Sequence, residues 1–152
     1  MPYEFKTTRR IEFAETDMAG IVHFASFFRY MEETEHAFYR SLGFSVHHRT
    51  PDGFVGWPRV QAGCDFRHPV RFEDEVEVHL LVRRREPKSI EYQFVFRVQR
   101  EGGDIDVASG TMKVVCAARS SKQPELHAVT IPPQIAEKIE VAPPELLDAL
   151  GT

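Results

Sequence analysis

The middle of the chain alternates apolar with polar residues over two long segments. Residues 75–83 and residues 90–99 each place an apolar side chain at every second position. A period of two is typical of half-buried β-strands. The break at Glu86-Pro87-Lys88 and the pair Gly102-Gly103 predict turns that join these strands to each other and to a strand at about 105–118. The result is an antiparallel meander, and further strands are predicted at 3–13 and, with a less regular pattern, at 57–68.

A different period marks residues 24–42. Apolar or small side chains recur there at steps of three and four residues, at Phe27, Tyr30, Met31, Thr34, Ala37, Phe38, Ser41 and Leu42. Charged residues fall between them, at Arg29, Glu32, Glu33, Glu35 and Arg40. This pattern predicts a long amphipathic helix that ends at Gly43, because glycine adopts the left-handed conformation of a helix end at low cost. Residues 44–56 are expected to form loops and turns.

The order of these elements defines a fold class. One strand, one long helix and four further strands predict an α+β fold, in which a single helix packs on a five-stranded antiparallel sheet. One helix cannot cover so broad a sheet, so we expect the chain to self-associate, at least as a dimer. The pairs Pro132-Pro133 and Pro143-Pro144 stand where proline begins short helices, in a tail that we expect to be loosely packed.

Composition narrows the function classes. The chain has 152 residues and a formal net charge of −4 at pH 7, which fits one domain and argues against a general nucleic-acid binder. The first residues lack the pattern of a signal peptide, and no apolar run reaches the roughly 20 residues that span a bilayer. We therefore expect a cytoplasmic protein that does not bind membranes.

Residues that commonly hold metals or cofactors form no recognisable set. Cys64 and Cys116 lack a Cys-x-x-Cys spacing and are interpreted as reduced core residues. The pair His47-His48 lacks a spaced carboxylate partner, and no G-x-S-x-G motif supplies a serine nucleophile. The expectation is no metal and no cofactor.

Asp17 is the residue most suggestive of chemistry. It lies between the first strand and the long helix, a few residues before the helix begins. The first N–H groups of a helix lack partners and, with the helix dipole, can stabilise a developing oxyanion. A carbonyl held there would be polarised beside a carboxylate. Equally, an Asp before a glycine-containing loop can form an Asx turn or cap the helix, and spacing alone leaves both interpretations open.

A longer motif favours the catalytic interpretation. The run from Phe13 to Glu32, F-A-E-T-D-M-A-G-I-V-H-F-A-S-F-F-R-Y-M-E, resembles the signature of hotdog-fold thioesterases of the 4-hydroxybenzoyl-CoA thioesterase type. The run His68 to Val78, H-P-V-R-F-E-D-E-V-E-V, is similar to a strand entry of that family. The resemblance covers about residues 3–118. It implies a long central helix wrapped by the sheet, active sites at a subunit interface, a hotdog domain at 1–130 and a separate tail at 131–152.

The resemblance also implies roles for residues of the motif. The Asp at the position of Asp17 is nucleophile or general base in that family, and the backbone amide of Phe24 is the matching oxyanion donor, with His23 beside it. Family members often have Tyr or His where this chain has Phe24, so a backbone donor is retained but a side-chain acid is not. Gly20 and Val22 belong to the same substrate-facing turn.

Other positions are expected to bind the substrate. Phe27 and Trp57 are candidates for an acyl pocket, although such aromatic residues are more often part of a core. Arg83, Arg84, Arg85 and Lys88 could hold the phosphates of coenzyme A, or simply form a solvated turn. Lys88-Ser89 lies where family members often have a polar pair near the pantetheine arm.

The resulting hypothesis is an acyl-CoA thioesterase that forms homodimers or homotetramers and releases a free acid and coenzyme A. An acyl-carrier-protein thioesterase is the alternative within the enzyme class. A hotdog domain that binds acyl thioesters without hydrolysing them is a second alternative, and a structural module in which Asp17 is only a turn residue is a third. The sequence leaves open the acyl group and the choice between nucleophile and base.

Overall fold

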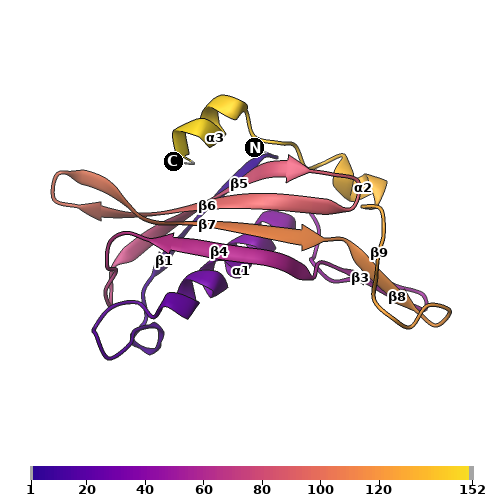
Figure 1. Ribbon diagram of the computed structural model, residues 1–152, viewed down its shortest axis with the longest axis horizontal. Coiled ribbons are helices and arrows are strands. Elements are labelled where there is room, and N and C mark those ends of the chain that lie inside the picture. The colour runs from indigo at the N-terminus through magenta and orange to yellow at the C-terminus, as the bar shows by residue number, and fades with distance from the viewer. Residues whose placement is uncertain (1, 151–152) are drawn as a thin grey trace.

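Residues 2–150 are described by a computed structural model, and they form one main antiparallel sheet with a helix against it (Figure 1). The helix is α1 (Phe24–Ser41). The sheet has the order β1 (Glu4–Arg10), β5 (Glu75–Arg85), β6 (Ser89–Arg100), β7 (Gly103–Val115) and β4 (Arg59–Phe66). A short 3-10 helix, η1 (Phe13–Glu15), leads from β1 toward α1. The predicted α+β architecture with five antiparallel strands is confirmed.

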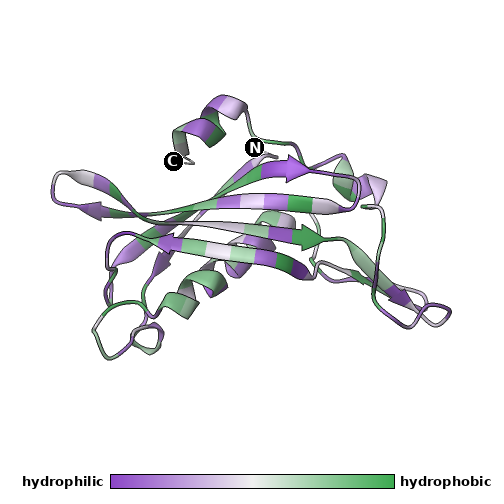
Figure 2. Cartoon of the chain, viewed as in Figure 1, coloured by the Kyte–Doolittle hydropathy of each residue, from purple (hydrophilic) through white to green (hydrophobic). Residues whose placement is uncertain are grey.

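The central strands are in a register that explains their alternating sequence. β5 pairs Leu80 with Phe94 of β6, and β6 pairs Phe94 with Gly110 of β7. Figure 2 shows hydrophobic and hydrophilic bands alternating along these strands. A Cβ atom on Gly110 would lie 2.6 Å from the Sδ atom of Met31 on α1. Glycine at this position therefore lets the helix pack closely on the sheet.

Aromatic side chains of α1 fill the space between helix and sheet. Phe27 lies edge-on to Phe96 of β6, with ring centroids 5.2 Å apart. Farther along the helix, Phe38 meets Tyr92 in the same edge-on manner at 6.4 Å. Full burial of such a side chain contributes roughly 2–3 kcal/mol. This packing fixes the position of the helix, and hence of its N-terminus, on the sheet.

A second, smaller sheet was not expected from the sequence. It consists of β2 (His48–Thr50), β3 (Gly53–Gly56), β8 (Ala117–Ser120) and β9 (His127–Ala128), in that order. The prediction that 44–56 is loop and turn is wrong for β2 and β3, which are too short to show a period of two. The predicted strand at 105–118 divides at Cys116, whose N–H donates to Lys88 O at 2.8 Å.

The C-terminal segment contains the two predicted helices, α2 (Pro133–Ala136) and α3 (Pro144–Leu150). Figure 1 shows α3 on the side of the main sheet opposite to α1. The expectation of a loosely packed tail is wrong, because Ile131, Ile135 and Ile139 are buried in the hydrophobic core. A domain boundary at residue 130 stays a prediction. No helix within residues 2–150 is long and apolar enough to cross a membrane.

Glu35 departs from the predicted pattern of α1. It was assigned to the polar face, but its side chain is completely buried. Its spacing from Met31 and Phe38 places it on the core face, and its charge obscured that pattern. Arg59 donates to Glu35 Oε1 at 2.5 Å, whereas the buried Oε2 atom has no hydrogen-bond partner among the described residues. Burial raises the pKa of Glu35 to about 7, although Arg59 acts against this shift.

We predict that Glu35→Gln removes a pH dependence of the free energy of unfolding. The pKa of Glu35 is about 7 in the folded protein against an ordinary value of 4.5. The folded state therefore binds the proton of the Glu35 carboxyl more tightly than the unfolded state does. The free energy of unfolding falls as the pH rises from the ordinary pKa of 4.5 to the folded-state pKa of about 7, by roughly 3 kcal/mol in total. Glutamine keeps the acceptor for Arg59 but cannot ionise.

Urea denaturation from pH 4.5 to 8 measures this effect. Glu101→Gln, at an exposed turn, is the matched control and should keep the wild-type pH dependence. If the free energy of unfolding depends on pH in the Glu35→Gln variant as it does in wild type, ionisation of Glu35 does not cause that dependence.

Candidate active site

Residues 15–23 form a closed loop between η1 and α1. The N–H of His23 donates to Glu15 O at 2.8 Å, and the N–H of Asp17 donates to Ile21 O at 2.9 Å. These bonds join the two sides of the loop, so that Asp17 lies just beyond its base. The end of the loop is therefore held close to the start of α1.

The loop is also attached to the main body of the protein. Within the loop, Thr16 and Val22 form an isolated antiparallel bridge. Val22 is buried, and its N–H donates to Val70 O at 2.7 Å. At the tip, Gly20 has a φ of +78°, a conformation that favours glycine. Gly20 and Val22 thus shape and anchor the turn that carries Asp17, and their predicted contact with substrate stays a prediction.

Asp17 is half-buried, and one of its two carboxylate oxygens is hydrogen-bonded. Its Oδ1 atom accepts a hydrogen bond from the N–H of Ala19 at 2.9 Å, and its backbone carbonyl accepts one from Gly20 at 3.0 Å. The Asx turn considered as the alternative role is thus present. The second oxygen, Oδ2, has no hydrogen-bond partner within residues 2–150. One carboxylate oxygen orients the group, and the other is available to a water or a substrate.

The first backbone amides of α1 differ in their partners. Ala25 donates to His23 Nδ1 at 3.3 Å, and Ser26 donates to His23 O at 2.9 Å. Phe24, the first residue of the helix, has an N–H without an acceptor in the described part of the chain. This N–H is the free donor at the positive end of the helix dipole.

His23 is the N-cap residue of α1. Its Nδ1 atom accepts from Ala25, which requires the neutral imidazole with its proton on Nε2. The ring also lies against Phe24, with centroids 4.8 Å apart. The geometry defines a capping role for His23, and its catalytic role stays a prediction.

Large apolar side chains are exposed around this loop. Phe13 and Met18 lie within or next to it, and Phe24 follows it; their exposures are 75%, 107% and 60%. Phe72 packs edge-on against Phe13, with ring centroids 6.0 Å apart. Phe66, at the end of β4, is also exposed. The loop that carries Asp17 therefore has exposed apolar side chains within it and next to it, which suit an apolar ligand or another protein surface.

Two predicted acyl-pocket residues belong to the core of the single chain. Phe27 packs between Phe66 and Phe96, and Trp57 packs on Tyr39 with ring centroids 5.5 Å apart. Each is only 4% exposed. Phe27 borders the apolar surface through Phe66, whereas Trp57 lies elsewhere in the core. Contact of either residue with substrate stays a prediction.

The predicted coenzyme A-binding residues lie away from Asp17. Arg83, Arg84 and Arg85 form the exposed end of β5, Lys88 is exposed in the following turn, and Ser89 is buried. Arg83 and Arg84 line a groove of about 1150 Å³ that also includes Gln93 and residues 140–144. The Arg84 guanidinium lies 3.7 Å from the Glu86 carboxylate and 3.8 Å from the Glu91 carboxylate, and the side chain is largely exposed. The structure does not bring this basic group to Asp17 within one chain.

One residue near the loop escaped the sequence analysis. Arg9, on β1, contacts the side chain of Glu15 at the base of the loop. The motif includes Glu15 as the acidic residue before Asp17. Arg9 belongs to no motif, and a single Arg on an expected strand gives no signal of a partner distant in sequence.

Comparison with known proteins identifies the family. The chain belongs to the Thioesterase-like superfamily, whose family model matches residues 11–149. A relative from Aquifex aeolicus (strain VF5) is 33% identical over 140 residues, covering 92% of this chain and 99% of the relative. The 1,4-dihydroxy-2-naphthoyl-CoA hydrolase of Synechococcus sp. (strain WH7803) is 27% identical over 125 residues, covering 78% and 79% of the two chains.

Solved structures agree with this assignment. The structure of a gentisyl-coenzyme A thioesterase has a TM-score of 0.70 and 29% identity, covering 87% of this chain and 99% of that chain. The 4-hydroxybenzoyl-CoA thioesterase of Pseudomonas sp. strain CBS-3 has a TM-score of 0.73 at 19% identity, covering 89% and 98%, and shows the same fold. The predicted hotdog fold and thioesterase family are confirmed, and the chain is a thioester hydrolase.

We predict that the capping role of His23 can be separated from catalysis. His23→Ala removes the acceptor for the Ala25 amide and should lower the free energy of unfolding by about 1 kcal/mol. His23→Asn retains a side-chain acceptor, so its free energy of unfolding and its rate of thioester hydrolysis should both be close to those of wild type. Urea denaturation and a thiol-release assay measure the two effects. A normal stability but a severely reduced rate in His23→Asn would contradict this assignment and favour a catalytic imidazole.

Proposed function

We propose that this protein hydrolyses the thioester bond of an aromatic acyl-CoA to the free acid and coenzyme A. The observation that carries the proposal is that one closed loop carries the carboxylate of Asp17 and leads into a helix that starts at Phe24. The Oδ2 atom of that carboxylate and the Phe24 N–H both lack a hydrogen-bond partner within residues 2–150. The names of two relatives support the substrate class, since one acts on 1,4-dihydroxy-2-naphthoyl-CoA and one on gentisyl-CoA.

In the proposed mechanism, the N–H of Phe24 donates to the carbonyl oxygen of the thioester. This bond strengthens as negative charge develops on that oxygen, so it stabilises the transition state more than the substrate. A preorganised donor of this kind contributes about 10²–10³ in rate. The fixed start of α1 supplies the donor without rearrangement during the reaction.

Asp17 has two possible chemical roles. As general base, it accepts a proton from water while the water oxygen adds to the carbonyl carbon; the tetrahedral intermediate then expels the thiolate, which takes up the proton. As nucleophile, it adds to the same carbon and expels the thiolate, and water hydrolyses the resulting anhydride. Both routes can use the Oδ2 atom, which the Asx turn leaves without a hydrogen-bond partner among residues 2–150.

The surroundings of the loop support an aromatic acyl group. Phe13, Phe24 and Phe72 are exposed there, and their rings offer faces and edges on which an aromatic ring can pack. Ring stacking of this kind adds about 0.5–1.5 kcal/mol to the burial of apolar surface. A straight acyl chain would gain only the burial.

We also propose that a second copy of the chain completes the site. The N–H of Val22 joins the loop to Val70, shortly before β5 starts at Glu75, and Arg85 ends this 11-residue strand. An extended strand of that length spans roughly 30 Å. The basic residues 83–88 are therefore better placed to serve the Asp17 site of a partner subunit. The outer edge of β4 is available for such pairing in the described chain, and Val60 and Phe66 on it are exposed.

Replacement of Asp17 tests the proposed reaction. We predict that Asp17→Asn lowers kcat by about 10²–10⁴ with little change in KM, because the amide cannot accept a proton or attack the carbonyl. Free thiol is measured after mixing the protein with 4-hydroxybenzoyl-CoA, 1,4-dihydroxy-2-naphthoyl-CoA, acetyl-CoA and palmitoyl-CoA, and with an acylated carrier protein. The aromatic esters should react fastest.

Asp104→Asn, at the exposed start of β7, is the matched control and should keep the wild-type rate. Equal rates in the Asp17→Asn variant and wild type would remove Asp17 from the mechanism. Faster hydrolysis of the carrier-protein ester would favour the alternative substrate class. Binding of the esters without release of thiol would support a binding domain instead.

A further inference from the structure

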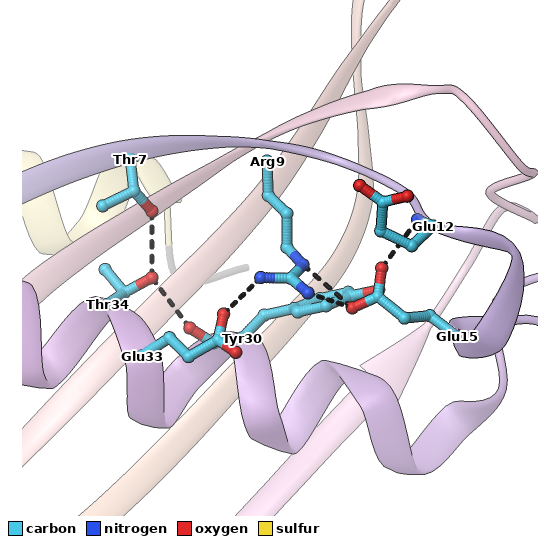
Figure 3. Close-up of polar contacts among 7 residues, drawn as sticks. All are labelled: Thr7, Arg9, Glu12, Glu15, Tyr30, Glu33 and Thr34. Atoms are coloured by element: carbon cyan, nitrogen blue, oxygen red, sulfur yellow. Dashed lines mark hydrogen bonds and ion pairs between the residues drawn. The ribbon is translucent and has the colours of Figure 1, made fainter.

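Arg9 is the centre of a charged cluster that joins three segments of the chain (Figure 3). From β1, its Nε atom donates to Glu15 Oε2 at 3.0 Å, and its NH2 group donates to the same oxygen. Its NH1 group donates to Glu33 Oε2 on α1 at 2.5 Å. One guanidinium group thus links the first strand, the base of the Asp17 loop and the long helix.

Tyr30 supports the guanidinium from below. The carbon at the centre of the Arg9 guanidinium lies 4.8 Å from the centroid of the Tyr30 ring, which is a cation–π distance. Tyr30 is 1% exposed, and burial raises its pKa to about 12. The ring therefore stays neutral over the working pH range. The Arg9 guanidinium therefore packs on a buried aromatic ring and binds two carboxylates.

Glu15 connects this cluster to the loop in several ways. Its Oε1 atom accepts from the N–H of Glu12 at 2.7 Å. Its backbone carbonyl accepts from the N–H of His23 at 2.8 Å and from the Ser26 hydroxyl at 3.2 Å. The position of Glu15 therefore sets both ends of the loop: the strand side that leads to Asp17 and the helix side that begins at His23.

The charges explain why this link depends on Arg9. Glu15 is only 11% exposed, so its ionised carboxylate needs the guanidinium more than a surface carboxylate would. Without Arg9, the carboxylates of Glu15 and Glu33 would face one another without a cation between them. Repulsion between like charges would then push the loop base away from the helix.

We propose that Arg9 is a positioning residue that holds the Asp17 carboxylate and the Phe24 amide at their working separation. This inference rests on the function proposed above. Arg9 touches neither group and acts through Glu15. The fold itself does not require Arg9, because β1 pairs with β5 over seven residues and Val22 still binds Val70. Loss of Arg9 therefore loosens the loop and leaves the sheet in place.

The first test measures catalysis in Arg9→Gln and Arg9→Lys, with Arg10→Gln as matched control. Arg10 is the next residue on β1 and its side chain is exposed. We expect Arg9→Gln to lower kcat about 10- to 100-fold, because small displacements of reacting groups have effects of this size. KM should change little, and the variant should remain folded by circular dichroism. Arg9→Lys keeps the positive charge but cannot donate two hydrogen bonds to Glu15 in the geometry of a guanidinium group, so it should recover only part of kcat.

A double variant separates positioning from general loosening of the protein. In the Asp17→Asn background, Arg9→Gln should cause no further loss of rate, because there is no working carboxylate left to position. Equal kcat in Arg9→Gln and wild type would overturn the proposal. So would a loss in the double variant that equals the product of the two single losses.

A second measurement does not depend on activity. Hydrogen exchange of the amides of Asp17 and His23, which the loop bonds protect, should be faster in Arg9→Gln than in Arg10→Gln. Unchanged exchange in Arg9→Gln would show that Arg9 does not hold the loop. If wild type hydrolyses no thioester, the proposed function fails, and this exchange experiment still decides whether Arg9 holds the loop.

Discussion

The hydrogen bond from the His23 N–H to the Glu15 carbonyl is the interaction on which the site depends. It closes, at 2.8 Å, a loop that leads from one group of the proposed mechanism to the other. One is the carboxylate of Asp17, and the other is the free N–H of Phe24. Neither group is unusual alone. In the proposed mechanism they act together, because the short loop joins the segment that carries the negative side chain to the positive end of a helix.

The rest of the fold keeps this loop in place. Phe27 and Phe38 pack α1 on the sheet, and Gly110 removes the side chain that would separate helix and strand. The helix start is then fixed by the core, whereas the strand side of the loop is fixed by Glu15 and Arg9. The hydrophobic core thus holds the helix side of the candidate site, and the charged cluster holds its strand side.

Long periodic elements were predictable from the sequence, whereas contacts between distant segments were not. The alternation around Phe94 and the helical period of residues 24–42 led to the main sheet and α1. The prediction that Glu35 lies on the polar face of α1 is wrong, because a charged residue is expected at the surface even where its spacing places it on the core face. Strands β2 and β3 have too few residues to show a period. Asp17 was found because its neighbours form a contiguous motif; Arg9 was not, because its partner Glu15 is a neighbour only through folding.

The measurement that tests the central claim most directly is the rate of thioester hydrolysis by Phe24→Pro, compared with Phe24→Ala. Both substitutions remove the aromatic ring of Phe24, and only proline also removes the N–H. Proline suits the first position of a helix, and the ψ of 133° at His23 is compatible with a following proline. Phe24→Pro should remain folded by circular dichroism and lose about 10²–10³ in kcat. Phe24→Ala, which keeps the N–H, should lose far less. Hydrolysis by folded Phe24→Pro at the rate of Phe24→Ala would contradict the account.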